Sequence, residues 1–180
     1  MELPTLIPEM VQDDLVNAIC AAPNGIIRMS DVMPGVVETS SNLSIVRSAK
    51  GKIELQCLSR SFIDTARDNI ASSLESCFQL AGAKVELTGA YPGWKPNPES
   101  EILKVMRETF LKMKGKDAAE VAMHAGLECG ILGATYPNWD MVSFGPTINH
   151  PHSPSEKVHI ESVARFWELL KEVLKNAPLK

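Results

Sequence analysis

Two histidines in a proline-rich loop are the residues of this sequence best suited to bind a metal ion. His150 and His152 stand within residues 144–157, which also hold Glu156 and follow a short apolar run. Loops at strand ends often build the active sites of α/β proteins. A neutral imidazole suits Zn²⁺, and Glu156 could orient the ring of His152. A zinc site takes three or four protein ligands, so two solvated loop histidines are the alternative interpretation.

A second candidate site is the turn that follows the short apolar run 121–123. His124 and Glu128 lie in the sequence His-Ala-Gly-Leu-Glu-Cys-Gly. Backbone N–H groups in such turns can bind an anion, and the carboxylate of Glu128 could bind an ammonium group. The alternative is a strand-to-helix turn that places Glu128 in the first helical turn, where its charge favours the helix dipole.

The third candidate is the pair Asn42 and Arg60, which together suit a carboxylate ligand. A guanidinium group forms two parallel hydrogen bonds to a carboxylate, and an asparagine amide can add a third donor. The alternative is that both residues are ordinary polar residues on a solvated strand face.

A predicted β-hairpin would bring Asn42 and Arg60 together. Residues 36–47 and 52–61 alternate between apolar and polar side chains, as half-buried strands do. The link Ala49-Lys50-Gly51 fits a three-residue loop with glycine in the left-handed position. The apolar faces then coincide when the pairs are Ser48 with Lys52, Ile45 with Leu55, Leu43 with Cys57, and Ser40 with Arg60. In this register Asn42 and Arg60 share the exposed face of the hairpin.

The other elements predicted around this hairpin indicate an α/β protein. Helical patterns cover residues 9–22, 64–81, 97–114 and 160–175, with a short helix within 126–133. Short strands are expected at 26–32, 85–91, 121–123 and 141–143. Residues 89–98, rich in proline and glycine, are the best domain boundary. The first block is typical of an incomplete α/β sandwich, and the second of edge pieces of a larger α/β sheet.

Composition gives no reason to expect nucleic acid or a membrane as a partner. The 180 residues have a formal net charge of -4 and no basic tract. No apolar run reaches the ~20 residues that span a bilayer, and the amino terminus has no secretory signal pattern. Four cysteines without a C-x-x-C pair predict buried free thiols and a cytoplasmic location.

The sequence contains five short motifs whose order along the chain carries information about its family. They are 35–43 (GVVETSSNL), 91–94 (YPGW), 124–130 (HAGLECG), 143–147 (SFGPT) and 152–156 (HSPSE). In this combination the chain, from about Pro4 onwards, resembles the metallopeptidase family that includes the aminoacyl-histidine dipeptidases, also called Xaa-His dipeptidases.

The resemblance implies a zinc-exopeptidase architecture with an inserted lid. Residues 1–92 would form a partial lid and dimerisation domain, and residues 93–180 the carboxy-terminal portion of the α/β catalytic domain. His152 would be the last zinc ligand, while His150 has no counterpart. The implied substrate-binding residues are Asn42, Arg60, His124, Gly126 and Glu128.

The catalytic residues of this family have no match in the sequence. Its His-x-Asp motif, bridging aspartate, Glu-Glu pair with the general base, and further acidic ligand are all missing. We therefore assign no catalytic residue, and we do not expect the family's two zinc ions to bind tightly to this chain alone. The isolated chain is expected to be inactive.

Three interpretations of the function follow. In the first, the chain is part of a dipeptidase that hydrolyses Xaa-His dipeptides such as carnosine with metal-activated water. Its partner would be a second copy or a complementary amino-terminal half. In the second, it is a non-catalytic dimerisation module. In the third, it is a single-domain enzyme with a mononuclear site on His150, His152 and Glu156.

Overall fold

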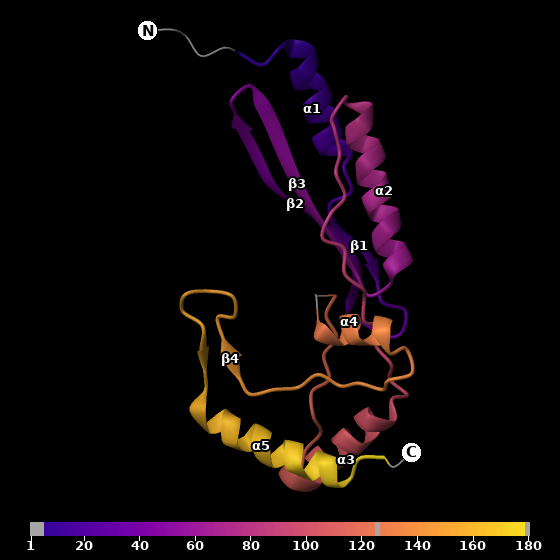
Figure 1. Cartoon of the computed structure of the whole chain (residues 1–180), viewed down its shortest axis with the longest axis vertical. Coiled ribbons are helices and arrows are strands. Elements are labelled where there is room, and N and C mark those ends of the chain that lie inside the picture. The colour runs from indigo at the N-terminus through magenta and orange to yellow at the C-terminus, as the bar shows by residue number, and fades with distance from the viewer. Residues whose placement is uncertain (1–5, 125–126, 179–180) are drawn as a thin grey trace. The chain divides into compact units, whose positions relative to one another are not determined.

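A computed structural model of the chain describes residues 6–124 and 127–178. Its elements are α1 (Glu9–Ala21), β1 (Gly25–Met29), β2 (Val37–Ala49), β3 (Lys52–Ser61), α2 (Asp64–Leu80), α3 (Glu101–Lys114), α4 (Glu128–Thr135), β4 (Ile148–Asn149), β5 (Lys157–Val158) and α5 (Ile160–Lys175) (Figure 1). The chain divides into two compact units. One holds Met1–Pro96 with Ala122–Ile131, and the other holds Asn97–Val121 with Leu132–Lys180.

The first unit is a two-layer α/β sandwich, as the sequence predicts. Its antiparallel sheet has the order β1-β2-β3, and α1 and α2 lie against one face of that sheet (Figure 1). Small residues near the end of α1 meet larger ones on α2 in a buried cluster of Ala18, Ala22, Ile70, Leu74 and Phe78. Leu43, Leu55 and Cys57 of the strands pack against that cluster. The opposite face of the sheet therefore carries the polar side chains of the same strands.

The turn between β2 and β3 is one residue shorter than predicted. Lys50 and Gly51 alone connect the strands, with φ angles of 52° and 71°. Ala49 therefore pairs with Lys52, where the sequence had predicted Ser48. Two left-handed central residues give a turn whose twist matches that of the paired strands, so the shorter connection is favoured.

A β-bulge compensates for this shift further along the hairpin. The register changes between Leu43 and Ile45, because two residues of β2 there oppose one residue of β3. Val46 takes the place opposite Leu55 that was predicted for Ile45. Beyond the bulge the predicted pairs are confirmed, namely Leu43 with Cys57 and Ser40 with Arg60.

Replacing Gly51 by alanine should lower the free energy of unfolding by about 1 kcal/mol. The φ of Gly51 is 71°, and an added Cβ would meet nothing within 4 Å, so the cost is conformational. The matched variant is Lys50→Gly, which removes a left-handed side chain (φ 52°) and should stabilise by a similar amount. Urea titration followed by circular dichroism measures both changes. Effects of the same sign would contradict this account of the turn.

The second unit is built on the packing of α3 against α5. Ser100 caps α3 by accepting a hydrogen bond from the Leu103 N–H at 3.1 Å, so the helix begins later than the Asn97-Pro98 start predicted from the sequence. Phe144 and Phe166 pack with ring centroids 5.2 Å apart. The hairpin of β4 and β5 carries the loop 150–156.

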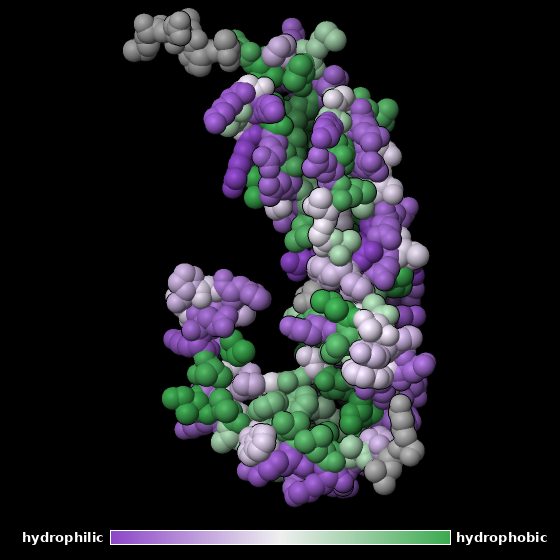
Figure 2. Space-filling model, in the orientation of Figure 1, coloured by the Kyte–Doolittle hydropathy of each residue, from purple (hydrophilic) through white to green (hydrophobic). Residues whose placement is uncertain are grey.

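Apolar side chains of α5 are only partly covered within the described residues. Trp167 is 55% exposed and Leu174 is 65% exposed. Figure 2 shows apolar side chains (green) at the surface of the second unit, beside polar ones. The apolar stripe of α5 is therefore wider than its packing against α3 requires.

Three predicted strands are not formed in the described residues. The segments 85–91, 121–123 and 141–143 have no strand assignment. Val121 is 82% exposed and Met123 is 56% exposed, so neither is buried in a sheet. A strand is defined by a hydrogen-bonded neighbour, and the described part of the chain provides none for these segments.

Two expectations from composition can also be compared with the structure. Cys20 is exposed and the other three cysteines are only half-buried, so the prediction of buried thiols is wrong, whereas all four are free as predicted. In the part of the chain that is described, no helix is both long and apolar enough to span a lipid bilayer.

Candidate functional site

The open face of the sheet in the first unit brings two of the predicted site residues together. Ser40 pairs with Arg60, and Asn42 pairs with Leu58. Because side chains alternate along a strand, these four lie on the sheet face opposite the helices. Asn42 and Arg60 are both exposed. The shared face predicted for Asn42 and Arg60 is therefore confirmed, while their role in binding stays a prediction.

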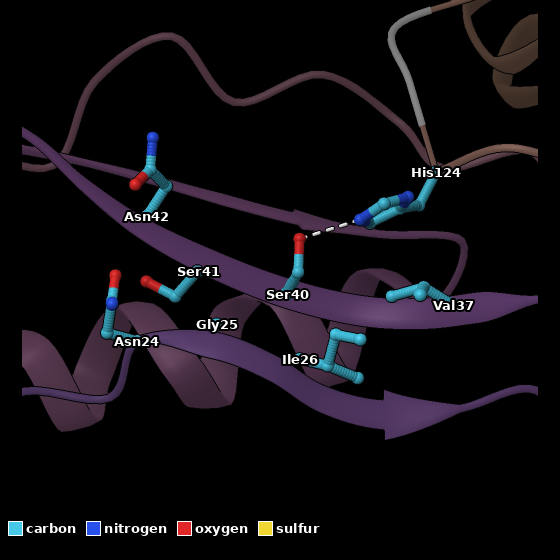
Figure 3. Close-up of a pocket in the computed structure, with 8 residues that line it drawn as sticks. All are labelled: Asn24, Gly25, Ile26, Val37, Ser40, Ser41, Asn42 and His124. Atoms are coloured by element: carbon cyan, nitrogen blue, oxygen red, sulfur yellow. Dashed lines mark hydrogen bonds between the residues drawn. The ribbon is translucent and has the colours of Figure 1, made fainter.

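His124 joins this face from a distant part of the sequence. Its Nε2 lies 2.6 Å from the hydroxyl of Ser40, 84 positions away in the chain. Figure 3 shows the imidazole facing Ser40, with Asn42 further along the same strand. The ring of Phe62 meets the His124 ring edge-on, with centroids 6.3 Å apart and planes at 66°. The imidazole is half-buried between strand and ring.

The electrostatics of this face favour a neutral imidazole. Burial lowers the pKa of His124 from its usual value, and the positive charge of Arg60 lowers that pKa further. The neutral ring can donate a hydrogen bond from one nitrogen and accept one at the other. Arg60 therefore supplies a positive charge near the imidazole, while the buried carboxylate of Glu38, two residues before Ser40 in β2, pairs with Arg28 at 3.3 Å.

A shallow pocket of about 330 Å³ opens beside Ser40 and His124. It is lined by Asn24, Gly25, Ile26, Val37, Ser40, Ser41, Asn42 and His124 (Figure 3). Within the described residues, the buried hydroxyl of Ser41 has no hydrogen-bond partner. The pocket therefore combines the apolar side chains of Ile26 and Val37 with neutral polar groups.

Close backbone contacts bring three chain segments together just after the end of β3. A Cβ on Gly93 would lie 2.3 Å from the carbonyl oxygen of Phe62, and one on Gly130 would lie 2.4 Å from that of Pro92. The Gly93 N–H also donates to Asp64 Oδ1 at 2.8 Å. Three chain segments thus approach more closely than side chains would allow. Residues 89–98 were predicted as a domain boundary and 91–94 as one of the five motifs, and neither pattern indicated this junction.

Glu128, a second predicted residue of the 124–130 motif, is not shown to contact this face. Glu128 is exposed and is the first residue of α4, so it occupies the helix-favouring position given above as the structural alternative. Gly126 lies outside the described residues.

His152 stands in an exposed, internally hydrogen-bonded loop of the second unit. The carboxylate of Glu156 accepts a hydrogen bond from the His152 backbone N–H at 2.7 Å. The prediction that Glu156 orients the imidazole is therefore wrong, since it holds the backbone instead. Ser153 donates to the His150 carbonyl at 2.8 Å, and both histidines have positive φ angles, 53° and 61°. The loop fixes its backbone and leaves the His152 ring exposed.

No metal centre is formed by the described residues alone. Among them, no three histidine, cysteine, aspartate or glutamate residues lie close enough together to hold a metal ion. His150, His152 and Glu156 are all described, so the mononuclear site considered for them is not formed. The two zinc ions implied by the resemblance likewise do not fit the described residues of this chain by themselves.

Comparison with known proteins places these features in a family context. No family model matches the chain. A cytosol non-specific dipeptidase of Escherichia coli is 49% identical over 169 residues, which are 94% of this chain and 35% of that protein. The crystal structure of an aminoacylhistidine dipeptidase from Vibrio alginolyticus has a TM-score of 0.85 and 44% identity, covering 99% of this chain and 37% of that one. The chain thus spans about a third of the length of these relatives.

Two matches have lower sequence identity. The structure of aminopeptidase PepT from Bacillus cereus has a TM-score of 0.71 at 18% identity, covering 91% of this chain and 44% of that one. A succinyl-diaminopimelate desuccinylase of Sulfurovum is 19% identical over 140 residues, 78% of this chain and 38% of that protein.

Fold and sequence together show that the chain is similar to part of proteins named as dipeptidases. Within that class it is related to the aminoacyl-histidine dipeptidases, and the resemblance drawn from its motifs is confirmed over a stretch equal to about a third of those proteins.

Proposed function

We propose that this chain is the carboxy-terminal part of a zinc-dependent dipeptidase, and that residues 1–92 form a partial lid that holds the free carboxylate of a dipeptide. The observation that carries the proposal is the convergence of Arg60, Asn42 and His124 on one open sheet face. The three residues come from separate parts of the sequence, and each can donate a hydrogen bond to an anion.

Each residue of the face has a distinct part in binding a carboxylate. The guanidinium of Arg60 supplies the charge and a planar pair of donors. The side-chain amide of Asn42 makes no hydrogen bond to the other residues drawn in Figure 3, and we propose that it donates to the ligand. The imidazole of His124 is neutral because burial and Arg60 lower its pKa. It adds a hydrogen-bond donor to the site and no further charge.

The names of the relatives support a dipeptide as the substrate and leave its breadth to experiment. The Vibrio alginolyticus protein is named for aminoacylhistidine substrates, and the Escherichia coli protein is named a non-specific dipeptidase of the cytosol. We infer cleavage of Xaa-His dipeptides such as carnosine, in the cytoplasm, with related dipeptides as further substrates.

Within the proposed enzyme, the exposed imidazole of His152 is one donor to the zinc pair. The other donors would come from polypeptide outside these 180 residues, since no group of three metal-binding residues occurs among the described ones. The zinc pair would supply the water that attacks the peptide bond. The residues present here bind and orient the substrate.

The pure 180-residue chain should release no histidine from carnosine, with or without added Zn²⁺. Chromatographic detection of free histidine tests this, with His152→Ala as the matched variant. Zinc-dependent turnover that is lost in His152→Ala would overturn the proposal that most zinc ligands lie on other polypeptide. Calorimetry that showed tight binding of two Zn²⁺ ions by the pure chain would do the same.

A second candidate function is a dimerisation module without catalysis of its own. It is favoured by β3, which is an edge strand in the described sheet order β1-β2-β3 and spans ten residues. Long edge strands offer free backbone groups to another chain. The partner would be a second copy or a complementary amino-terminal half, and sedimentation equilibrium of the pure chain decides between monomer and dimer.

A further inference from the structure

We propose that Ser40 is a positioning residue, whose hydroxyl holds the imidazole of His124 in one orientation and one tautomer beside Arg60. The inference deepens the proposed function, because it names the residue that prepares His124 for a carboxylate ligand. Sequence reasoning gave Ser40 no role beyond pairing with Arg60 in the hairpin.

The contacts around His124 show how its ring is fixed. The distance of 2.6 Å between Ser40 Oγ and His124 Nε2 is at the short end for a hydrogen bond between oxygen and nitrogen. The ring of Phe62 restricts the imidazole from another direction through an edge-on contact, with the two ring centroids 6.3 Å apart. Within the described residues, Ser40 is the only hydrogen-bond partner of this imidazole.

This arrangement matters because an imidazole has two different nitrogens. A freely turning neutral ring presents either a donor or an acceptor to a ligand. When the Ser40 hydroxyl donates to Nε2, the proton of the neutral ring stays on Nδ1, and this Nδ1–H is the group left to donate to a carboxylate. The neighbouring Arg60 and the half-burial of the ring keep the imidazole uncharged. With the Ser40 hydroxyl as donor, the Nδ1–H donor is ready before the ligand arrives, which lowers the ordering cost of binding.

Nitrogen-15 chemical shifts of the imidazole, measured on the labelled 180-residue chain above pH 7.5, test this inference. The His124 signals, assigned by their loss in His124→Gln, should show one tautomer in the unaltered chain. In Ser40→Ala they should move towards the mixture of free histidine, and Ser40→Thr should restore the single tautomer. A loss of fold alone would not be rescued in this way, and circular dichroism confirms that each variant is folded.

Ser44→Ala is the matched control. Ser44 is also an outward-facing serine of β2, but its hydroxyl donates to the backbone carbonyl of Gln56 at 3.0 Å. Its replacement should leave the His124 tautomer unchanged. The inference is overturned if Ser40→Ala leaves the tautomer as it was, or if Ser44→Ala changes it equally.

Titration with N-acetylhistidine, a free carboxylate probe, separates this inference from the proposed function. Ser40→Ala should bind the probe about 3- to 10-fold more weakly than the unaltered chain, as for the loss of one neutral hydrogen bond. Equal binding with an unchanged tautomer refutes the role of Ser40 and leaves the carboxylate site standing. A tautomer change without probe binding by either chain supports the role of Ser40 and counts against the carboxylate site.

Discussion

Alanine at position 93 should destabilise the first unit by about 3 kcal/mol, near the upper end of the cost of overpacking. The new Cβ would lie 2.3 Å from the oxygen and 2.6 Å from the carbon of the Phe62 carbonyl. Both are backbone atoms, so no side chain can turn away to relieve the clash. Moving the segment instead would stretch the 2.8 Å hydrogen bond from the Gly93 N–H to Asp64. Urea unfolding followed by circular dichroism measures the loss.

The control for this prediction is Gly89→Ala in the same segment. Gly89 has a φ of +71°, but an added Cβ would meet nothing within 4 Å. Its replacement should cost about 1 kcal/mol, for the left-handed conformation alone. Equal losses in the two variants would show that the close approach of Gly93 to Phe62 contributes nothing to stability.

Removal of the Arg60 side chain in the complete enzyme should lower kcat/KM by the equivalent of about 2–4 kcal/mol, as for a charged partner of a desolvated carboxylate. Arg60→Lys should lower kcat/KM by less than Arg60→Ala does, because lysine keeps the charge and loses only the planar pair of donors. Steady-state kinetics with carnosine measure the effect. In the isolated chain, Arg60→Ala should also raise the pKa of His124, because the Arg60 charge lowers it second only to burial.

Arg47→Ala is the control for Arg60→Ala. Arg47 is an exposed arginine of β2 that pairs with Glu54, near the turn of the same hairpin. Its loss should leave both the kinetics and the His124 pKa unchanged. Unchanged kinetics in Arg60→Ala itself would remove Arg60 from the substrate site.

Much of the first unit could be predicted from its sequence because local patterns determine it. Alternation along both strands specified the face shared by Asn42 and Arg60. The pairing of Ser40 with Arg60 was predicted correctly for an incomplete reason, since the turn is one residue shorter than expected and the bulge after Leu43 restores the register. The bulge left no signal in the residue pattern from which it could have been predicted.

The contacts that complete the candidate site could not be predicted in the same way. The hydrogen bond between Ser40 and His124 joins positions 84 residues apart, and no local pattern encodes such a pair. The strand predicted at 85–91 failed because a strand also needs a neighbour, which the described residues do not provide. The prediction paired Glu156 with His152 correctly but chose the imidazole, whereas the carboxylate binds the backbone N–H. Sequence spacing does not distinguish these two groups.

The bulge after Leu43 divides the β2–β3 hairpin into two lengths with different registers. Residues on the turn side follow the register set by Lys50 and Gly51, whereas Ser40 and Arg60 follow the register set beyond the bulge. A change in loop length at the tip can be absorbed where the ladder is already interrupted. The tip is therefore a natural place to attach a fluorophore or an epitope, leaving the ligand-facing end of the hairpin in its native alignment.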